Sequence, residues 1–137
     1  MSNIVLIKIG GGLITDKATP FSVRDDMMKT AADGIRRAKV KYPQLSFVVA
    51  NGAGSFGHYL ASKSAETDSP SAHQLRVRGI HESVARLNNI FTRHLLDAGI
   101  SAFSMSPSSF ISATDGVVSS VAGESVAALL DNSFVPV

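Results

Sequence analysis

Residues 4–12 decide how the chain folds, and they run Ile4-Val5-Leu6-Ile7-Lys8-Ile9-Gly10-Gly11-Gly12. A short apolar run that is rich in β-branched residues and closed by glycines is typical of a strand buried on both faces of a parallel sheet. Leu45 to Ala50 repeats this pattern and leads into a second glycine cluster, Asn51-Gly52-Ala53-Gly54-Ser55-Phe56-Gly57-His58. The sequence therefore predicts two buried strands, each followed by a glycine-rich turn.

Helical periodicity lies between and after these two strands. Ser22-Val23-Arg24-Asp25 has the spacing of a capping box, so a helix is predicted from there to about Val40. Thr15 to Phe21 is predicted to be a loop, and so is the serine-rich stretch Ser62 to Ala72. A short helix is predicted from His58 to Ala61.

The second half of the chain continues the alternation. The longest helix is predicted over Leu75 to Ala98, because apolar residues recur there at helical spacing and Gly99 follows as a C-terminal cap. A third strand is predicted over Ile100 to Met105. After it we expect a hairpin turning at Asp115-Gly116, a helix over Gly123 to Leu130 and a strand beginning at Phe134.

This order favours an α/β fold, a three-layer αβα sandwich with a mainly parallel sheet, built as one domain over residues 1–137. Ligands of such folds bind at the carboxyl ends of the strands, where both glycine clusters lie. The last residues, Phe134 to Val137, resemble a strand that has just begun. We therefore expect that the chain is the amino-terminal part of a larger protein, or that it pairs with a second copy or another chain.

Composition excludes several classes of protein. Hydrophobic residues make up 45% of the 137 residues and charged residues 18%, which excludes global disorder. The net charge is +2 and the longest basic run is Arg36-Arg37, so no nucleic-acid partner is expected. With no cysteine, the chain has no disulfide and no thiolate metal site. The apolar run Ile4 to Ile9 is too short for a signal segment or a membrane span, so we expect no membrane partner and a cytoplasmic location.

Both glycine clusters are candidates for phosphate binding. Glycine lets backbone N–H groups turn toward an anion, and Lys8 and Lys17 bracket the first cluster with positive charge. A tight strand exit with two surface lysines is the alternative interpretation. In the second cluster, a helix that begins near His58 would add its positive end, and His58 could donate to a phosphate oxygen. An ordinary polar residue in a first helical turn is the alternative for His58.

The two glycine clusters do not complete three known motifs that have similar glycine spacing. The P-loop pattern is absent from the first cluster. Gly52, Gly54 and Gly57 match the letters of the dinucleotide-binding fingerprint, but Pro70, Ser71 and Ala72 occupy the place of its acidic ribose partner. Ala53 replaces the first glycine of the nucleophile elbow around Ser55, which argues against a serine hydrolase. The remaining histidines lack metal-ligand spacing, so no metal ligand is expected, although His81 and Glu82 could border the site.

Taken in order, these stretches resemble the amino acid kinase superfamily, and within it the isopentenyl phosphate kinases. The similarity rests on Leu6 to Lys17 and on Gly52 to His58, with weaker matches at Gly79 to Glu82, Leu87-Asn88 and Pro107 to Phe110. The resemblance implies transfer of a phosphoryl group from ATP to isopentenyl phosphate, an isoprenoid precursor, with Mg²⁺. Fosfomycin-resistance kinases share the histidine, so a small phosphonate is the alternative acceptor. A truncated, non-catalytic module for phosphate binding or assembly is the other alternative.

The resemblance also implies roles for individual residues. Lys8 and the backbone of Gly10, Gly11, Gly12 and Gly54 would hold the phosphates of ATP. Lys17 would stabilise charge on the group in transfer, and His58 would hydrogen-bond the acceptor phosphate. Ala53, Gly54 and Gly57 would cradle phosphate through their N–H groups. Lys17, His58 and Lys8 are the expected catalytic residues, and phosphoryl transfer needs such positioning and charge neutralisation more than covalent chemistry.

Two features depart from the family pattern. Gly12 stands where the family usually has serine, so one hydroxyl contact to ATP is expected to be lost. The family places its adenine-binding region, a further lysine and an aspartate beyond the position of Val137. The resemblance thus implies an amino-terminal phosphate-acceptor domain without the nucleotide-binding half, which a homodimer or a separate half would complete.

Overall fold

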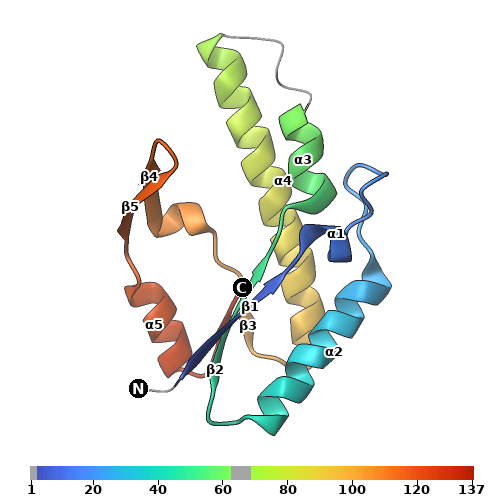
Figure 1. The fold of residues 1–137 in the computed structure, drawn as a ribbon, viewed down its shortest axis with the longest axis vertical. Helices are drawn as coiled ribbons and strands as arrows, with labels where there is room; N and C mark the ends of the chain where they lie inside the picture. The colour runs from blue at the N-terminus through green and yellow to red at the C-terminus, as the bar shows by residue number, and fades with distance from the viewer. Residues whose placement is uncertain (1–2, 63–68) are drawn as a thin grey trace.

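The computed structural model describes residues 3–62 and 69–137. The elements are, in chain order, β1 (Ile4–Ile9), α1 (Gly11–Ile14), α2 (Asp25–Lys41), β2 (Ser46–Asn51), α3 (Gly54–Ser62), α4 (Pro70–Asp97), β3 (Ala102–Phe103), the 3₁₀ helix η1 (Pro107–Ser109), β4 (Ile111–Thr114), β5 (Val117–Val121), α5 (Glu124–Asp131) and β6 (Val135–Pro136). Figure 1 shows β1, β2 and β3 in the middle of the molecule, with α2, α3 and α4 on one side and α5 and the hairpin of β4 and β5 on the other.

The central strands are parallel, as the sequence predicts. β1 pairs with β2 in a register that sets Lys8 opposite Ala50 and Ile9 opposite Asn51. β3 pairs with β6, also in parallel, and β6 lies against β2. The α/β fold class with a mainly parallel sheet is therefore confirmed.

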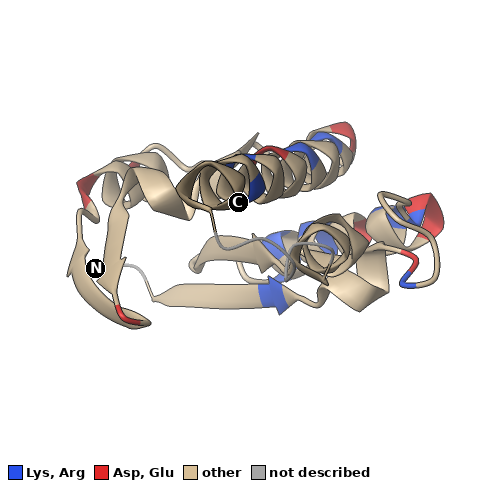
Figure 2. Cartoon of the chain, turned by 90° about the horizontal axis from the view of Figure 1, so that it is seen from above, with Lys and Arg blue, Asp and Glu red and all other residues tan. Residues whose placement is uncertain are grey.

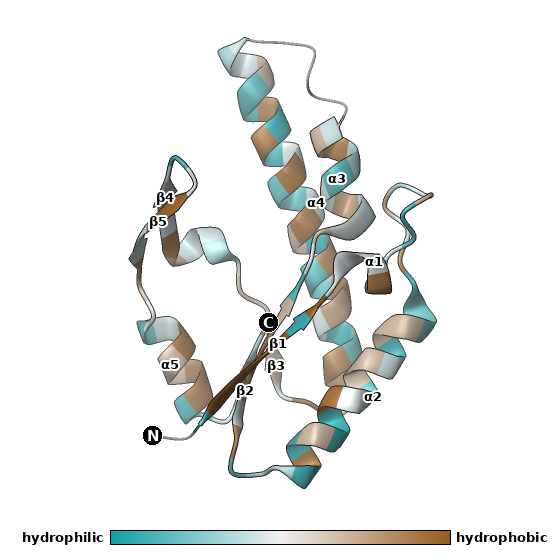
Figure 3. Ribbon diagram, in the orientation of Figure 1, coloured by the Kyte–Doolittle hydropathy of each residue, from teal (hydrophilic) through white to brown (hydrophobic). Residues whose placement is uncertain are grey.

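The core lies between the strands and the helices α2 and α4. Phe47 and Val49 of β2 face the helices and are buried. α4 contributes Leu87, Phe91 and Leu95, all with no exposed surface, which are part of the apolar stripe that the sequence indicates. Figure 3 shows hydrophobic residues along the strands and along the facing sides of these helices. Burying each such side chain contributes about 1.5–3 kcal/mol, so this layer holds the fold together.

The opposite face of β1 is exposed, which corrects the expectation of a strand buried on both faces. Ile4 is 61% exposed and Leu6 67%, whereas Val5, Ile7 and Ile9 are half-buried. The helix on this side, α5, contributes no buried residue. A near-continuous apolar run is compatible with burial of both faces of a strand. In this structure, elements pack on only one face of β1 closely enough to bury its side chains.

Several element boundaries also differ from the sequence-based expectation. α2 begins at Asp25 with Arg24 as N-cap and no side-chain capping bond, so the capping box at Ser22 is wrong. A four-residue helix, α1, follows β1 where only a glycine break was expected.

α4 starts five residues before Leu75, because the Ser69 hydroxyl accepts a hydrogen bond from the Ala72 N–H and Pro70 follows the cap. Part of the serine-rich loop predicted for this region, residues 63–68, lies outside the described residues. At the other end, Gly99 follows α4 with a positive φ of 81°, as predicted for a C-terminal cap.

The predicted hairpin is present. β4 and β5 pair antiparallel, and Asp115 and Gly116 turn between them with φ values of 51° and 78°. Two successive positive φ values are what a tight two-residue hairpin requires. Within the described ranges, no helix has the length and apolar character that a membrane crossing demands.

Candidate functional site

The two glycine clusters meet at the carboxyl ends of β1 and β2. The Gly52 N–H donates to the Ile9 carbonyl at 2.9 Å. A Cβ on Gly52 would lie 2.7 Å from the Gly11 nitrogen, and a Cβ on Gly54 would lie 2.8 Å from the Gly11 oxygen. Only glycines allow the two backbones to approach so closely. The expected convergence of the two turns is thus present in the structure.

Thr15 ties the two clusters together, and sequence reasoning missed it. This buried hydroxyl donates to the Gly11 carbonyl at 2.8 Å and accepts from the Ser55 N–H at 3.0 Å. Ser55 lies in the first turn of α3, where backbone N–H groups have no partner within the helix. Thr15 therefore acts as a remote cap, 40 residues away in sequence, and the only sequence signal was its position between the first cluster and Lys17.

The loop that carries Lys17 is held by hydrogen bonds within the loop and by ring contacts to α3. The Asp16 carboxylate accepts from the Ala18 N–H and from the Thr19 hydroxyl, both at 2.9 Å. At the far end of the loop, the Phe21 ring packs edge-on against Phe56 and Tyr59 of α3, with ring centroids 5.7 and 5.4 Å apart. The loop therefore has a defined position beside α3.

Within that loop, the Lys17 side chain lies against Gly12. A Cβ on Gly12 would collide with the Lys17 Cε. Gly12, where the resemblance implies a serine, thus leaves room for this position of the Lys17 side chain. The hydrogen bonds from Ala18 and Thr19 also keep the pKa of the neighbouring Asp16 carboxyl below its ordinary value, so a negative charge stays beside Lys17.

His58 lies one turn inside a helix rather than at its start. α3 begins at Gly54, whose φ of 51° lets the chain turn directly from the strand into the helix. The predicted short helix from His58 to Ala61 is therefore longer, and the backbone N–H groups of its first turn belong to the glycine cluster. His58 itself is exposed. A first-turn position for His58 is wrong, although its helix stays attached to the site.

α4 fixes the orientation of α3. The buried Ser83 hydroxyl donates to the Phe56 carbonyl at 2.9 Å. A Cβ on Gly57 would meet the Val84 side chain at 3.5 Å, so the two helices are in close contact. Gly57 thus serves the packing of two helices, whatever it contributes to a ligand.

Lys8 lies on the exposed face of β1, two residues before the first cluster. Among the described residues, no salt bridge engages Lys8, Lys17 or His58. Figure 2 shows basic and acidic residues interspersed along the helices rather than gathered by sign. Two unpaired lysines near the glycine clusters therefore supply local positive charge.

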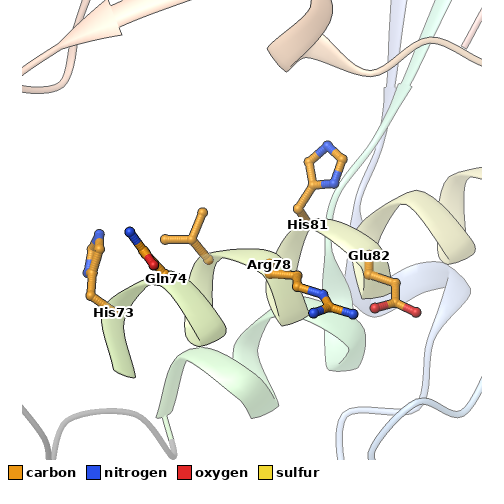
Figure 4. Close-up of a pocket in the computed structure, with 6 residues that line it drawn as sticks. His73, Gln74, Arg78, His81 and Glu82 are labelled. Atoms are coloured by element: carbon orange, nitrogen blue, oxygen red, sulfur yellow. The ribbon is translucent and has the colours of Figure 1, made fainter. Parts of the chain in front are cut away.

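One surface pocket holds part of the first cluster, and another lies along α4. One is lined by Gly12, Thr15, Lys17 and Arg24, among others, and holds part of the first cluster with its lysine. The other lies on α4 and is lined by His73, Gln74, Val77, Arg78, His81 and Glu82 (Figure 4). This second pocket contains none of the residues predicted to bind phosphate.

His81 has a structural contact of its own. Its Nε2 lies 3.3 Å from the Ser106 hydroxyl and 3.2 Å from the Ser108 hydroxyl. His81 therefore joins the first half of α4 to the segment that follows β3, beyond the carboxyl end of that strand.

Comparison with known proteins places these features in context. The isopentenyl phosphate kinase of Methanothermobacter thermautotrophicus is 32% identical over 142 residues, covering 98% of this chain and 52% of that protein. The isopentenyl phosphate kinase of Methanocaldococcus jannaschii is 26% identical, covering 98% of this chain and 54% of that protein. A crystal structure of isopentenyl phosphate kinase superposes with a TM-score of 0.82 at 30% identity, over 98% of this chain and 56% of the other.

The chain spans about half the length of these relatives. Residues 3–137 match the sequence profile of the amino acid kinase family, which is essentially all of the chain that the structure describes. With the parallel sheet and the paired glycine turns, this match shows that the chain belongs to the amino acid kinase family.

Proposed function

We propose that this chain forms the phosphate-acceptor part of an isopentenyl phosphate kinase, which transfers the γ-phosphoryl group of ATP to isopentenyl phosphate and yields isopentenyl diphosphate. The observation that carries the proposal is the backbone-to-backbone contact of the two glycine clusters, held by Thr15 and flanked by Lys8 and Lys17. Relatives that bear this activity by name match over 98% of the chain.

The chemistry asks little covalent work of the protein. An oxygen of the acceptor phosphate attacks the γ-phosphorus while the bond to the bridging oxygen of ADP breaks. The acceptor is already anionic near neutral pH, so no strong base is needed. The protein must hold two anions side by side and neutralise charge as it spreads over the transferring group.

The residues of the site fit those tasks. N–H groups of Gly10, Gly11 and Gly12 would receive the donor phosphates together with Lys8. Lys17, whose loop is anchored to α3, would follow the transferring group. The N–H groups of Ala53, Gly54 and Gly57 and the His58 imidazole would hold the acceptor. His58 then acts as a hydrogen-bond donor to phosphate.

Mg²⁺ would be supplied with the nucleotide. Within residues 3–62 and 69–137, no group of three His, Cys, Asp or Glu side chains is arranged to hold a metal ion. The pocket at the first cluster offers lysine and backbone N–H groups, which suit phosphate oxygens, together with the carboxylates of Asp16, Asp25 and Asp26. Bound with the nucleotide, Mg²⁺ would neutralise charge on the leaving group.

The assembly of the site is also part of the proposal. Residues 1–137 would correspond to the amino-terminal half of the relatives, and a homodimer or a separate polypeptide would supply the nucleotide-binding half. We place this activity in the cytoplasm, where ATP is available.

The proposal is tested with the enzyme completed by its nucleotide-binding half, ATP, Mg²⁺ and isopentenyl phosphate. Formation of the diphosphate is followed by ³¹P NMR, and acceptor binding by titration calorimetry. His58→Ala should lower catalytic efficiency at least a hundredfold, roughly 3 kcal/mol. His73→Ala is the matched control, because His73 is a histidine on α4 outside the predicted site.

Three results would change the assignment. Failure of a complete, folded enzyme to turn over or to bind isopentenyl phosphate would refute it. Stronger competition by fosfomycin would assign the acceptor to the phosphonate class. Binding without turnover, even with the second half supplied, would indicate a non-catalytic module.

A further inference from the structure

A line of side-chain hydrogen bonds lies behind the second glycine cluster. The Ser104 hydroxyl, just after β3, donates to the Asn88 Oδ1 at 2.5 Å. The Asn88 Nδ2, on α4, donates to the Asn51 Oδ1 at 2.9 Å. All three side chains are partly buried. The line therefore joins the end of β2, the middle of α4 and the end of β3, and it runs in one direction.

The direction of these hydrogen bonds determines which group of the Asn51 amide is free to bind a ligand. Its oxygen is occupied by Asn88, so its NH₂ group is the end of the line. In the described part of the chain, that NH₂ meets only the Gly52 carbonyl, at 3.5 Å. Such a distance is long for an N–H···O bond, and an amide NH₂ carries two donors. Asn51 thus offers unused N–H groups beside the first glycine of the second cluster.

The register of the sheet shows which face this donor occupies. Side chains alternate along a strand, and Phe47 and Val49 of β2 are buried against the helices. Asn51 follows with the same parity, in agreement with its contact to α4. The helix that carries His58 packs on α4 as well. Asn51 and His58 therefore belong to the same side of the sheet.

We propose that the side-chain NH₂ of Asn51 binds an oxygen of the acceptor phosphate, and that Asn88 is a positioning residue that keeps this NH₂, and not the amide oxygen, directed at the glycine cluster. The inference rests on the proposed phosphoryl transfer and adds a neutral donor to it. A donor that is oriented before the ligand arrives needs no reorganisation during the reaction.

Asn88→Asp tests the direction of the line. Aspartate has nearly the shape of asparagine but only accepts hydrogen bonds when ionised. It can still accept from Ser104, but its second oxygen would then oppose the Asn51 oxygen. The Asn51 amide is expected to turn over and donate to Asp, which leaves its oxygen facing the phosphate. Asn89→Asp is the matched control, because it changes the same charge on the next residue, which is exposed.

Titration calorimetry with isopentenyl phosphate should show at least a tenfold loss of affinity for Asn88→Asp and for Asn51→Asp, with less than a twofold change for Asn89→Asp. The ¹H–¹⁵N signals of the Asn51 NH₂ should shift when isopentenyl phosphate or inorganic pyrophosphate binds to the unmodified chain, a response that a merely structural asparagine would not give. In Asn88→Asp this response should disappear while the thermal melting curve still shows a folded protein.

Unchanged affinity of Asn88→Asp would mean that the Asn51 NH₂ already points at Asn88, and it would overturn the inference while leaving the proposed function intact. If the unmodified chain binds pyrophosphate but not isopentenyl phosphate, the proposed function fails and the same variants are compared with pyrophosphate. If it binds neither anion, both proposals fail.

Discussion

Replacing Thr15 by valine removes the hydroxyl that joins the two glycine clusters and keeps the shape of the side chain. Thr15 is 1% exposed, so water cannot take over the hydrogen bonds of its hydroxyl. Two hydrogen bonds are lost, one to the Gly11 carbonyl and one from the Ser55 N–H. The Gly11 carbonyl keeps the bond from the Thr15 backbone N–H, at 2.9 Å. The Ser55 N–H keeps no partner among the described residues.

The loss of stability follows from the difference between the Gly11 carbonyl, which keeps a partner, and the Ser55 N–H, which does not. Each lost hydrogen bond contributes about 0.5–1.5 kcal/mol, and leaving a buried N–H without a partner costs about 1–3 kcal/mol. Because the two effects overlap at Ser55, we expect Thr15→Val to lower the free energy of unfolding by about 2–4 kcal/mol. With a urea dependence of about 2 kcal/mol/M, the unfolding midpoint falls by about 1–2 M.

Urea unfolding followed by circular dichroism measures this shift. Thr30→Val is the matched control, since the Thr30 hydroxyl bonds only the Asp26 carbonyl on an exposed helix face. It should change the free energy of unfolding by less than about 0.5 kcal/mol. Thr15→Ser keeps the hydroxyl and should lie between the two valine variants. A Thr15→Val midpoint equal to that of the control would refute the remote cap.

Three further outcomes are expected. Gly54→Ala should lower the free energy of unfolding by more than about 2 kcal/mol in a thermal melt, because a φ of 51° costs alanine about 1–2 kcal/mol before any collision; Gly34→Ala, in the open middle of α2, should instead raise it by roughly 0.5–1 kcal/mol. Thr92→Val should raise the melting temperature, since this buried hydroxyl has no partner in the described chain and its loss is worth about 1 kcal/mol. The hydrogen bond from Lys29 lowers the pKa of the Asp25 carboxyl, so the stability that this carboxylate contributes is present above pH 3.8 and is lost as the pH falls through its lower pKa in the folded protein. Asp25→Asn should therefore lose less stability in acid. Equal loss of stability in acid for the two proteins would refute this.

β1, β2 and the turn at Asp115 were predictable from the sequence, because they depend on local chemistry. The strand predicted over Ile100 to Met105 is shorter in the structure, where β3 covers only Ala102–Phe103. A β-branched run closed by glycines has few alternatives to a buried strand, and Asp-Gly adopts two positive φ values more readily than other pairs. The long helix over α4 was predictable for the same reason, since its apolar stripe repeats over several turns. Only its first turn, capped by Ser69, was missed.

The remaining parts of the site depend on residues far apart in sequence. α3 begins at Gly54 because Thr15 caps it, and no local rule links positions 15 and 55. Asn88 belongs to a weak family match at Leu87-Asn88, but the sequence does not show that its side chain meets Asn51. Neither pairing can be deduced from periodicity, because periodicity describes which face a residue occupies and not what lies opposite.

The register between β1 and β2 gives the proposed reaction its geometry. Lys8 lies opposite Ala50 and Ile9 opposite Asn51, so Lys8 projects from the exposed face of the sheet while Asn51 projects toward α4. Groups on opposite faces of a sheet can serve one reaction only beyond the ends of the strands. There the two glycine clusters lie backbone to backbone, with no side chain of Gly11, Gly52 or Gly54 between them. In the proposed reaction, the donor phosphates would lie on the Lys8 side and the acceptor on the side of His58 and Asn51, and the transferred group would pass over the glycines between them.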